Sequence, residues 1–353
     1  MTSFSARLIA WQEHCGRRDL PWQNTRDPYR IWLSEIMLQQ TQVATVMPFY
    51  QRFLSVLPDV HSLATASIDI VLQLWSGLGY YRRAHLLHRA AQEVVGRYGG
   101  AFPRNAATLE TLPGIGRSTA AAIAAFAYGE RGAILDGNVK RVLARHQGVG
   151  GYAGDPGVER ALWVQAENLL PDAQIEPYTQ ALMDLGATVC LRSTPDCARC
   201  PVAGDCIARL QNRIDELPAP RPRKPLPQRE IAVLLIGRGD EILLERRPPT
   251  GIWAGLWSLP EIACDADAAG YCRDRFGADI AAGAAMAPIE HTFTHFRLRL
   301  TPLPCTVKRW PMRAEDAGPA ACMWLPLPDA TGAALPAPIK KLLRSLASRY
   351  ATA

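Results

Sequence analysis

The sequence lacks any long hydrophobic run. A helix that spans a membrane needs about 18 or more consecutive apolar residues, and the longest candidate, Thr119 to Tyr128, is alanine-rich and is ended by Gly129. The first residues lack the apolar core of a signal peptide and show instead the helical spacing Phe4, Leu8, Ile9. We therefore expect a chain without a membrane span that works in the cytoplasm.

The sequence also lacks the even, regular cysteine spacing of a secreted disulfide framework. It has nine cysteines, four of them within 17 residues and five scattered singly. Charged residues of both signs are common: the chain has 39 Lys and Arg and 33 Asp and Glu, which gives a net charge of +6. That balance permits a nucleic-acid partner without requiring one. The length of 353 residues and the 48% hydrophobic content fit about two folded domains.

Two kinds of hydrophobic periodicity divide the chain. Residues 1–217 show successive amphipathic helices with short turns and no convincing strand. Residues 218–230 form a basic linker, in which five prolines alternate with Arg221, Arg223 and Lys224. In residues 231–353, apolar or alternating runs over 231–236, 242–244 and 292–301 predict strands, and Pro338 opens a terminal helix. We expect an all-α domain, a linker and an α+β domain.

The four clustered cysteines, Cys190, Cys197, Cys200 and Cys206, predict one metal site in residues 190–206. Separately placed, four such thiols would be exposed and reactive. Only Cys197 and Cys200 have the two-residue spacing that structural zinc sites usually repeat twice. We therefore favour an iron–sulfur cluster, with zinc and a metal-free loop as alternatives. Arg192 in the same loop is either a DNA phosphate contact or a solvated charge.

A glycine-rich turn lies at Leu112 to Gly116. Gly114 and Gly116 allow close backbone approach, and the N–H groups of the helix that follows form an anion site suited to a phosphate. Twenty residues later Asp136 follows an apolar pair and precedes another helix. Such a carboxylate is either an ordinary helix N-cap or, held ionised by N–H donors, a partner for a developing cation.

A second acid, Glu35, lies among apolar residues in the predicted helix over Trp32 to Leu38. It is either a surface glutamate of an amphipathic helix or a carboxyl group in a dry pocket. In a dry pocket, desolvation would raise its pKa and keep a proton available. Glu35 and Asp136 would then divide proton donation and charge stabilisation between them.

The segment Gly77 to Arg83 combines glycines, two tyrosines and two arginines. An exposed aromatic ring on such a turn can wedge between bases while the arginines contact phosphates. The alternative is a pair of tyrosines packed in a corner between helices.

Together these residues resemble the adenine DNA glycosylase (MutY) family of the helix-hairpin-helix superfamily, which also includes endonuclease III. The resemblance rests on LPW at 20–22, WLSEIMLQQTQV at 32–43, GLGYY at 77–81, LPGIGRSTA at 112–120, ILDGNVKR at 134–141 and the four cysteines. It implies a helix-hairpin-helix glycosylase domain with one [4Fe–4S] cluster on those cysteines, followed by a MutT-like (Nudix) domain.

The resemblance implies excision of adenine opposite 8-oxoguanine or guanine in double-stranded DNA by a monomeric enzyme. Glu35 would protonate N7 of a flipped adenine, Asp136 would stabilise the oxocarbenium-like sugar, and water would complete the hydrolysis. The implied DNA contacts are the wedge residues Gln40 and Tyr80, the pocket residues Gln23, Ser118, Asn138 and Gln180, and the backbone contacts Gly114, Gly116, Arg82 and Arg192.

Lysine is nearly absent from residues 1–217, where Lys140 stands alone. Glycosylases that also cut the DNA strand usually form a Schiff base through a lysine, and endonuclease III has lysine where Ser118 stands here. We therefore expect a monofunctional enzyme. Lys140, one helical turn after Asp136, leaves room for a weak side reaction.

The C-terminal domain resembles the part of this family that recognises 8-oxoguanine. It lacks the glutamate clusters of working Nudix hydrolases, so we expect binding rather than hydrolysis. The family's Phe-Ser-His turn reads Phe293, Thr294 and His295, where threonine keeps the hydroxyl group and adds a methyl group. Alternatively, Thr294 and His295 occupy opposite faces of a strand.

Two other functions remain alternatives. An endonuclease III-like glycosylase and lyase for damaged pyrimidines is disfavoured by Ser118 and by the scarcity of lysine. A DNA-binding module without catalysis is disfavoured by the presence of both Glu35 and Asp136.

Overall fold

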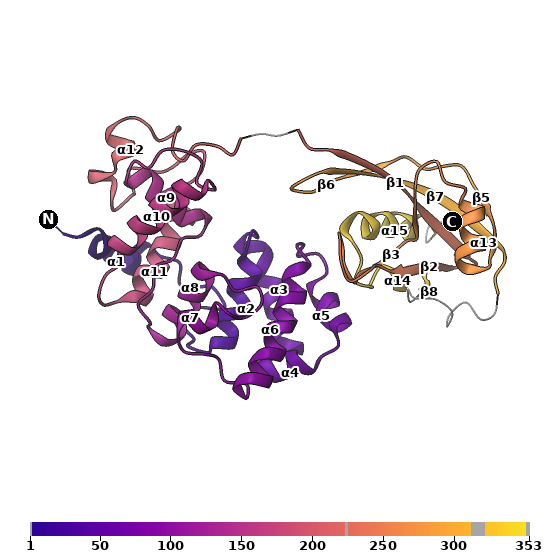
Figure 1. The fold of residues 1–353 in the computed structure, drawn as a ribbon, viewed down its shortest axis with the longest axis horizontal. Coiled ribbons are helices and arrows are strands. Elements are labelled where there is room, and N and C mark those ends of the chain that lie inside the picture. Colours follow the sequence, from indigo (N-terminus) through magenta and orange to yellow (C-terminus); the bar gives the residue numbers. More distant parts are fainter. Residues whose placement is uncertain (1, 223–224, 312–321, 351–353) are drawn as a thin grey trace. The chain divides into compact units, whose positions relative to one another are not determined.

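The computed structural model describes residues 2–222, 225–311 and 322–350, and the chain forms two compact units (Figure 1). The first unit comprises Met1–Ala66 and Arg83–Arg223, and the second comprises Ser67–Arg82 and Lys224–Ala353. The division after Arg223 falls within the predicted linker over 218–230. The domain bounds at 217 and 231 stay a prediction, and the basic pair Arg223 and Lys224 lies outside the described residues.

Residues 2–222 are helical, as the sequence predicts; apart from one isolated bridge between Tyr152 and Ala219, this stretch holds no strand. The α-helices are α1 (Phe4–Cys15), α2 (Pro28–Leu38), α3 (Val43–Val56), α4 (Val60–Thr65), α5 (Ile68–Trp75), α6 (Arg82–Tyr98), α7 (Ala106–Leu109), α8 (Arg117–Tyr128), α9 (Gly137–His146), α10 (Pro156–Asn168), α11 (Ile175–Asp184) and α12 (Ile207–Leu210). A π-helical turn, η1 (Leu185–Val189), continues α11, and a 3₁₀ turn, η2 (Ala203–Asp205), precedes α12.

Two helices position the acids that the sequence singled out, with Glu35 in the last turn of α2 and Asp136 just before α9. Helix α2 begins with Pro28 after the N-cap Asp27, whose side chain accepts from the N–H of Tyr29. Its apolar residues, including Trp32 and Leu33, are fully buried and fix the helix in the core. Helix α9 begins after the N-cap Asp136. The core beside α9 contains the small alanine side chains of α8, which allow close helix packing.

The second unit contains a mixed sheet, so the predicted α+β class is confirmed. Its strands are β1 (Gln228–Arg238), β2 (Glu241–Arg246), β3 (Trp257–Ser258), β4 (Glu261–Ile262), β5 (Asp279–Ala282), β6 (Ile289–Thr292), β7 (Arg297–Arg309) and β8 (Cys322–Pro326). The main path is β3-β2-β1-β7-β5, with β4 paired to β1, β6 to β7 and β8 to β2. The helices are α13 (Ala268–Phe276), α14 (Leu327–Ala330) and α15 (Ala337–Tyr350), and α15 is the predicted terminal helix.

Strands β1 and β7 run parallel, from the pair of Gln228 with Arg297 to the pair of Gly237 with Thr306. The predicted strand over 292–301 is wrong as a single element. Strand β6 ends at Thr292 and pairs antiparallel with β7, so residues 293–296 form the turn between them. The alternation holds only from Phe296 to Leu300, and the three-residue spacing of Phe293 and Phe296 breaks it, so the predicted strand starts too early. The end of the predicted linker is also strand, because β1 begins at residue 228.

Within the described parts of the chain, no helix is both long enough and apolar enough to cross a membrane.

Candidate active site

Glu35 lines a cleft of about 360 Å³ beside α2 and α11. Cleft volumes of about 300–1,000 Å³ are typical of small-ligand sites. Burial raises the pKa of Glu35 to about 8, and the nearby charge of Asp136 adds to this rise. The dry-pocket interpretation of Glu35 is therefore favoured over the surface one, and this carboxyl group can hold a proton at neutral pH.

Asp136 is the N-cap of α9. Its Oδ1 accepts from the backbone N–H groups of Asn138 and Val139, each at 2.8 Å. These donors lower the pKa of Asp136, as do the charges of Arg141 and Lys140, but burial outweighs them and the net direction is upward. The sequence-based expectation named the donors correctly and missed the burial, which arises from tertiary packing.

Side chains around the start of α9 connect it to two other segments. Ser118 Oγ accepts from the N–H of Leu135 at 2.9 Å, which joins α8 to the segment before Asp136. Asn138 Oδ1 accepts from the Arg141 guanidinium at 2.9 Å. Arg141 also donates to the carbonyl of Cys190 at 2.8 Å. Ser118 and Asn138 thus help to hold the loop of Asp136 in place.

Gln23 and Gln180, two of the predicted pocket residues, line the same cleft as Glu35. Gln23 Nε2 donates to the carbonyl of Arg17 at 3.0 Å, and Gln180 Nε2 donates to Asp184 Oδ1 at 2.8 Å. Asp184 is fully buried and pairs with Arg17 at 2.7 Å. An ion pair with a buried carboxylate thus braces the cleft wall that carries both amides.

The glycine-rich turn presents backbone to solvent. Gly114 and Gly116 are both exposed. Gly114 has φ of +80°, and a Cβ there would lie 2.9 Å from the Cβ of Leu86. Gly116 is the N-cap of α8 without a side-chain cap, so the first N–H groups of α8 remain available to an anion.

Gln40 and Tyr80 share an unusual backbone conformation. Their φ angles are +56° and +50°, in the left-handed region that side-chain-bearing residues rarely adopt. Gln40 is exposed and Tyr80 is 46% exposed. The corner-packing alternative for Tyr80 is therefore disfavoured, since its ring reaches solvent. Strained exposed residues of this kind cluster at functional sites.

The two arginines after this turn differ. Arg82 is exposed, in agreement with a phosphate contact. Arg83 is 8% exposed and donates to the carbonyls of Ile36 and Met37, so the expectation of paired phosphate contacts is wrong for it. Arg192, in the cysteine segment, is exposed.

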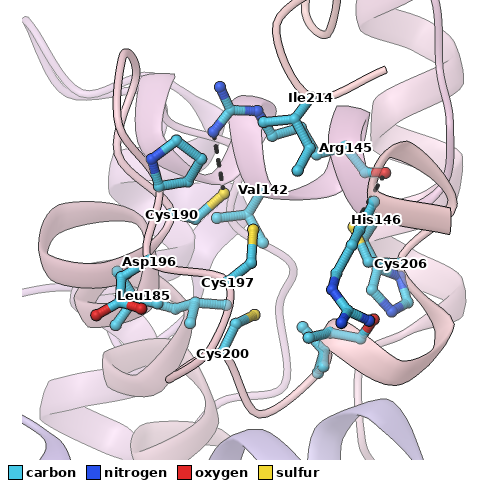
Figure 2. Close-up of a pocket in the computed structure, with 15 residues that line it drawn as sticks. Val142, Arg145, His146, Leu185, Cys190, Asp196, Cys197, Cys200, Cys206 and Ile214 are labelled. Atoms are coloured by element: carbon cyan, nitrogen blue, oxygen red, sulfur yellow. Dashed lines mark hydrogen bonds between the residues drawn. The ribbon is translucent and has the colours of Figure 1, made fainter. Parts of the chain in front are cut away.

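The four clustered cysteines line one cavity with apolar side chains, and Figure 2 shows their sulfur atoms facing it. Burial raises the pKa of Cys197 and Cys206, and that of Cys200 to about 11. Within the described ranges, no three His, Cys, Asp or Glu side chains have the spacing of a single-ion site. Four thiols around a shared space fit the donor set of an iron–sulfur cluster.

Arg145 fastens the loop that carries these cysteines. It is 4% exposed and donates to Cys190 Sγ at 3.5 Å (Figure 2). It also donates to the carbonyls of Leu191, Arg192 and Leu217, at 2.6, 2.9 and 2.8 Å. Sequence reasoning missed Arg141 and Arg145, although their four-residue spacing on one helix face was an available signal.

The turn over 293–296 exposes Thr294 and His295, so they do not occupy opposite strand faces. The N–H of Phe293 donates to the carbonyl of Phe296 at 2.9 Å, and their rings stack at 4.6 Å. The ring of Trp253 lies 5.4 Å from that of Phe293. Sequence reasoning missed Trp253, and no local pattern marks it.

Two sequence families match parts of the chain. The family described as HhH-GPD superfamily base excision DNA repair protein matches residues 33–168. The NUDIX domain family matches residues 231–345.

Curated relatives match over most of the chain. The adenine DNA glycosylase of Buchnera aphidicola subsp. Acyrthosiphon pisum is 34% identical over 97% of this chain and 97% of its own length. The human adenine DNA glycosylase is 36% identical over 74% of this chain and 58% of its own length. Among solved structures, a thermostable thymine-DNA glycosylase is 30% identical over 59% of this chain and 95% of its own, with a TM-score of 0.53.

Proposed function

The chain belongs to the adenine DNA glycosylase family, and we propose that the adenine it removes in base excision repair is mispaired with 8-oxoguanine or guanine. As a DNA N-glycosylase it is a hydrolase that binds DNA. The observation that carries the mechanism is Glu35, a carboxyl group with a pKa of about 8 in a cleft and in electrostatic reach of Asp136.

Glu35 is the proton donor in this proposal. A flipped adenine in the cleft would receive the Glu35 proton at N7, which weakens its bond to the sugar. The raised pKa supports this role, because an ordinary glutamate with a pKa near 4.5 would be ionised at neutral pH. Gln23, Ser118, Asn138 and Gln180 are the proposed pocket residues around the base.

Asp136 is the proposed stabiliser of the cationic sugar. Its two backbone donors and the nearby charge of Arg141 favour the ionised form against burial. A carboxylate fixed at the start of α9 needs little rearrangement when positive charge develops in front of it. Water then attacks the sugar and completes the hydrolysis.

The enzyme is proposed to be monofunctional. Lys140 Nζ pairs with Glu159 at 2.7 Å, which supports a structural role for it. Ser118 cannot form a Schiff base, and it already accepts a backbone N–H. Borohydride should not trap a covalent adduct with DNA efficiently, and efficient trapping with strand cleavage would contradict monofunctional action.

DNA contacts are proposed at the exposed turns. Gln40 and Tyr80 would fill the space that the flipped base leaves, as their exposed left-handed conformations suggest. Gly114 and Gly116 would receive a phosphate at the start of α8, and Arg82 and Arg192 would contact the backbone elsewhere. Binding should weaken steeply as salt concentration rises.

One [4Fe–4S] cluster is the proposed cofactor, held by Cys190, Cys197, Cys200 and Cys206. A cluster bound to all four thiolates would close residues 190–206 into a rigid loop. The buried cation of Arg145 supports the proposal, because it would offset negative charge at Cys190. Equal iron and sulfide contents in purified protein are expected, whereas stoichiometric zinc in colourless protein would contradict the cluster.

The second unit is proposed to recognise 8-oxoguanine through Phe293, Thr294 and His295. The exposure of Thr294 and His295 supports contact with a base. We also propose that the protein acts as a monomer in the cytoplasm; the uneven spacing of its nine cysteines, which is unlike a secreted disulfide framework, supports a reducing compartment.

The test uses labelled duplexes that carry adenine opposite 8-oxoguanine, adenine opposite guanine, adenine opposite thymine, or an oxidised pyrimidine, each followed by alkali. Strand breaks at adenine in the first two duplexes are expected. Breaks at the oxidised pyrimidine would favour the endonuclease III-like alternative, and binding without any break would favour a DNA-binding module.

A further inference from the structure

Arg83 makes an unusual set of contacts for a buried arginine in the first turn of α6. Its Nη1 donates to the carbonyl oxygens of Ile36 at 3.1 Å and Met37 at 2.8 Å, and also to that of Gln39. Its Nη2 donates to Thr41 Oγ1 at 3.0 Å. One guanidinium group therefore holds the end of α2 and the turn that follows it.

The chemistry of these contacts fits the end of a helix. The last carbonyl groups of α2 have no partner within the helix, and the helix dipole places partial negative charge there. The guanidinium cation places one nitrogen on the carbonyls and a second on the Thr41 hydroxyl group, and an ammonium group has a single nitrogen and cannot reach both. Glu35 lies in this last turn of α2.

The turn after α2 contains Gln40, exposed and with φ of +56°. That conformation is unfavourable for a residue with a side chain, so neighbouring contacts must hold it. Arg83 contacts the residues on both sides, Gln39 and Thr41. Within the turn itself, the N–H of Thr41 donates to the carbonyl of Leu38 at 3.2 Å, and Thr41 Oγ1 donates to the carbonyl of Gln39 at 3.3 Å.

We propose that Arg83 is a positioning residue for base excision, which holds Gln40 in the conformation that enters the duplex and fixes the end of the helix that bears Glu35. This inference rests on the proposed role of Gln40 as a wedge. Arg83 contacts neither DNA nor the reacting base. It acts through the backbone of residues 36–41.

A double-mutant cycle tests the coupling. Single-turnover excision from a duplex with adenine opposite 8-oxoguanine is measured for Gln40→Ala, Arg83→Gln and the double variant. We expect each single change to slow excision by about tenfold or more. The double variant should be no more than about threefold slower than Arg83→Gln alone, because Gln40 is already misplaced in that background.

The matched control is Arg89→Gln, which removes an exposed arginine from the same helix. It should leave the excision rate and the melting temperature unchanged. Arg83→Lys, which keeps the charge but has a single nitrogen, should restore only part of the rate. If Arg83→Gln does not fold, the same cycle with Arg83→Lys in its place tests the coupling between residues 83 and 40.

A second readout needs no DNA. Amide hydrogen exchange at Thr41 should be at least about tenfold faster in Arg83→Gln than in the unmodified protein, with exchange in α8 unchanged. Unchanged exchange at Thr41 would overturn the proposal. So would a double variant whose loss of excision rate equals the product of the losses in Gln40→Ala and Arg83→Gln. If Gln40→Ala alone leaves the rate unchanged, the wedge role itself fails, and the inference fails with it.

Discussion

Glu35 and Asp136 are both acids, yet the protein surrounds them differently. Glu35 has burial and a neighbouring negative charge, which both raise its pKa. Asp136 has burial opposed by two N–H donors and two cations. The donors and cations at Asp136, which Glu35 lacks, support the proposed division into a proton donor and an anion that glycosidic bond cleavage needs.

The first prediction concerns Glu35→Gln, which keeps the shape of the side chain and removes its proton. Excision should slow by about 10²–10⁴-fold, the usual contribution of a general acid, while the Kd for duplex DNA stays within about threefold. Single-turnover kinetics and a binding titration measure the two effects. Unchanged excision would remove Glu35 from the mechanism.

The melting temperature of Glu35→Gln gives an independent check on the raised pKa of Glu35, because the direction of its change with pH can be predicted. The folded protein keeps the Glu35 proton up to about pH 8, whereas an ordinary glutamate loses it near 4.5. The folded state therefore binds more protons in that window, and the contribution of Glu35 to the free energy of unfolding falls as pH rises through it. The melting temperature of Glu35→Gln should thus rise relative to that of the unmodified protein between pH 5 and about 8.

The second prediction is the pH dependence of excision itself. Because the reaction needs protonated Glu35, the single-turnover rate should fall as pH rises through about 8, by up to tenfold per unit above it. Enzyme saturated with DNA should be used, so that weaker binding does not mimic the effect. A rate that stays flat from pH 7 to 9.5 would be inconsistent with this proton donor.

The third prediction is that Asp136→Asn loses activity without losing stability. Asparagine caps a helix about as well as aspartate, so the start of α9 should keep its hydrogen bonds to residues 138 and 139. The negative charge is lost, and excision should slow by at least about 10²-fold. Circular dichroism measures the stability of Asp136→Asn, and single-turnover kinetics measure its activity. A variant that is fully active, or one that unfolds, would contradict the proposed role of Asp136.

At the scale of elements, the turn before α8 contains two glycines whose substitution should affect different properties. One should affect stability and the other DNA binding. A Cβ at Gly116 meets open space, and its φ of −98° suits any residue. A Cβ at Gly114 would lie too close to Leu86, and its φ of +80° disfavours side chains. The two glycines therefore differ in what a substitution to alanine would disturb.

The fourth prediction compares Gly116→Ala with Gly114→Ala. Gly116→Ala should melt like the unmodified protein but bind duplex DNA about tenfold more weakly, because the methyl group keeps a phosphate away from the N–H groups of α8. Gly114→Ala should lose on the order of 1 kcal/mol or more of stability. Undiminished DNA affinity in Gly116→Ala would argue against this turn as a phosphate site.

The elements that sequence predicts well are those with a local cause. The helices of residues 2–222 and the strands over 231–236 and 242–244 follow from the spacing of apolar residues. The position of Asp136 at the start of α9 could be predicted because an N-cap is a local feature, and the catalytic roles of Glu35 and Asp136 stay a prediction. Arg83 was misassigned because its partners lie more than 40 residues earlier in the chain. The turn over 293–296 was indicated by the family resemblance of Phe293 to His295, whereas the periodicity alone placed the start of the strand too early, at Thr292.

At the scale of the whole molecule, the net charge of +6 is unevenly placed. Residues 218–230 hold four basic and one acidic residue, or +3, which is half of the excess. Arg221 in this segment is exposed. A basic segment between the two units is suited to follow a phosphate backbone, while the turn before α8 supplies backbone N–H groups instead of charge.

The fifth prediction concerns the choice of mispair. Thr294→Ala removes an exposed hydroxyl group from the turn over 293–296. The preference for adenine opposite 8-oxoguanine over adenine opposite guanine should fall by about 5–50-fold, as expected for a lost hydrogen bond. The control Thr292→Ala, at the exposed end of β6, should keep the preference. Equal preferences in both variants would place 8-oxoguanine recognition elsewhere.

The most direct test of the two-carboxylate mechanism is single-turnover excision by the unmodified protein, Glu35→Gln and Asp136→Asn on one duplex with adenine opposite 8-oxoguanine. The unmodified protein should leave an alkali-labile site at that adenine and none at adenine opposite thymine. Both variants should bind the duplex and leave almost none. Full excision by either variant, or an intact duplex after incubation with the unmodified protein, would contradict the mechanism.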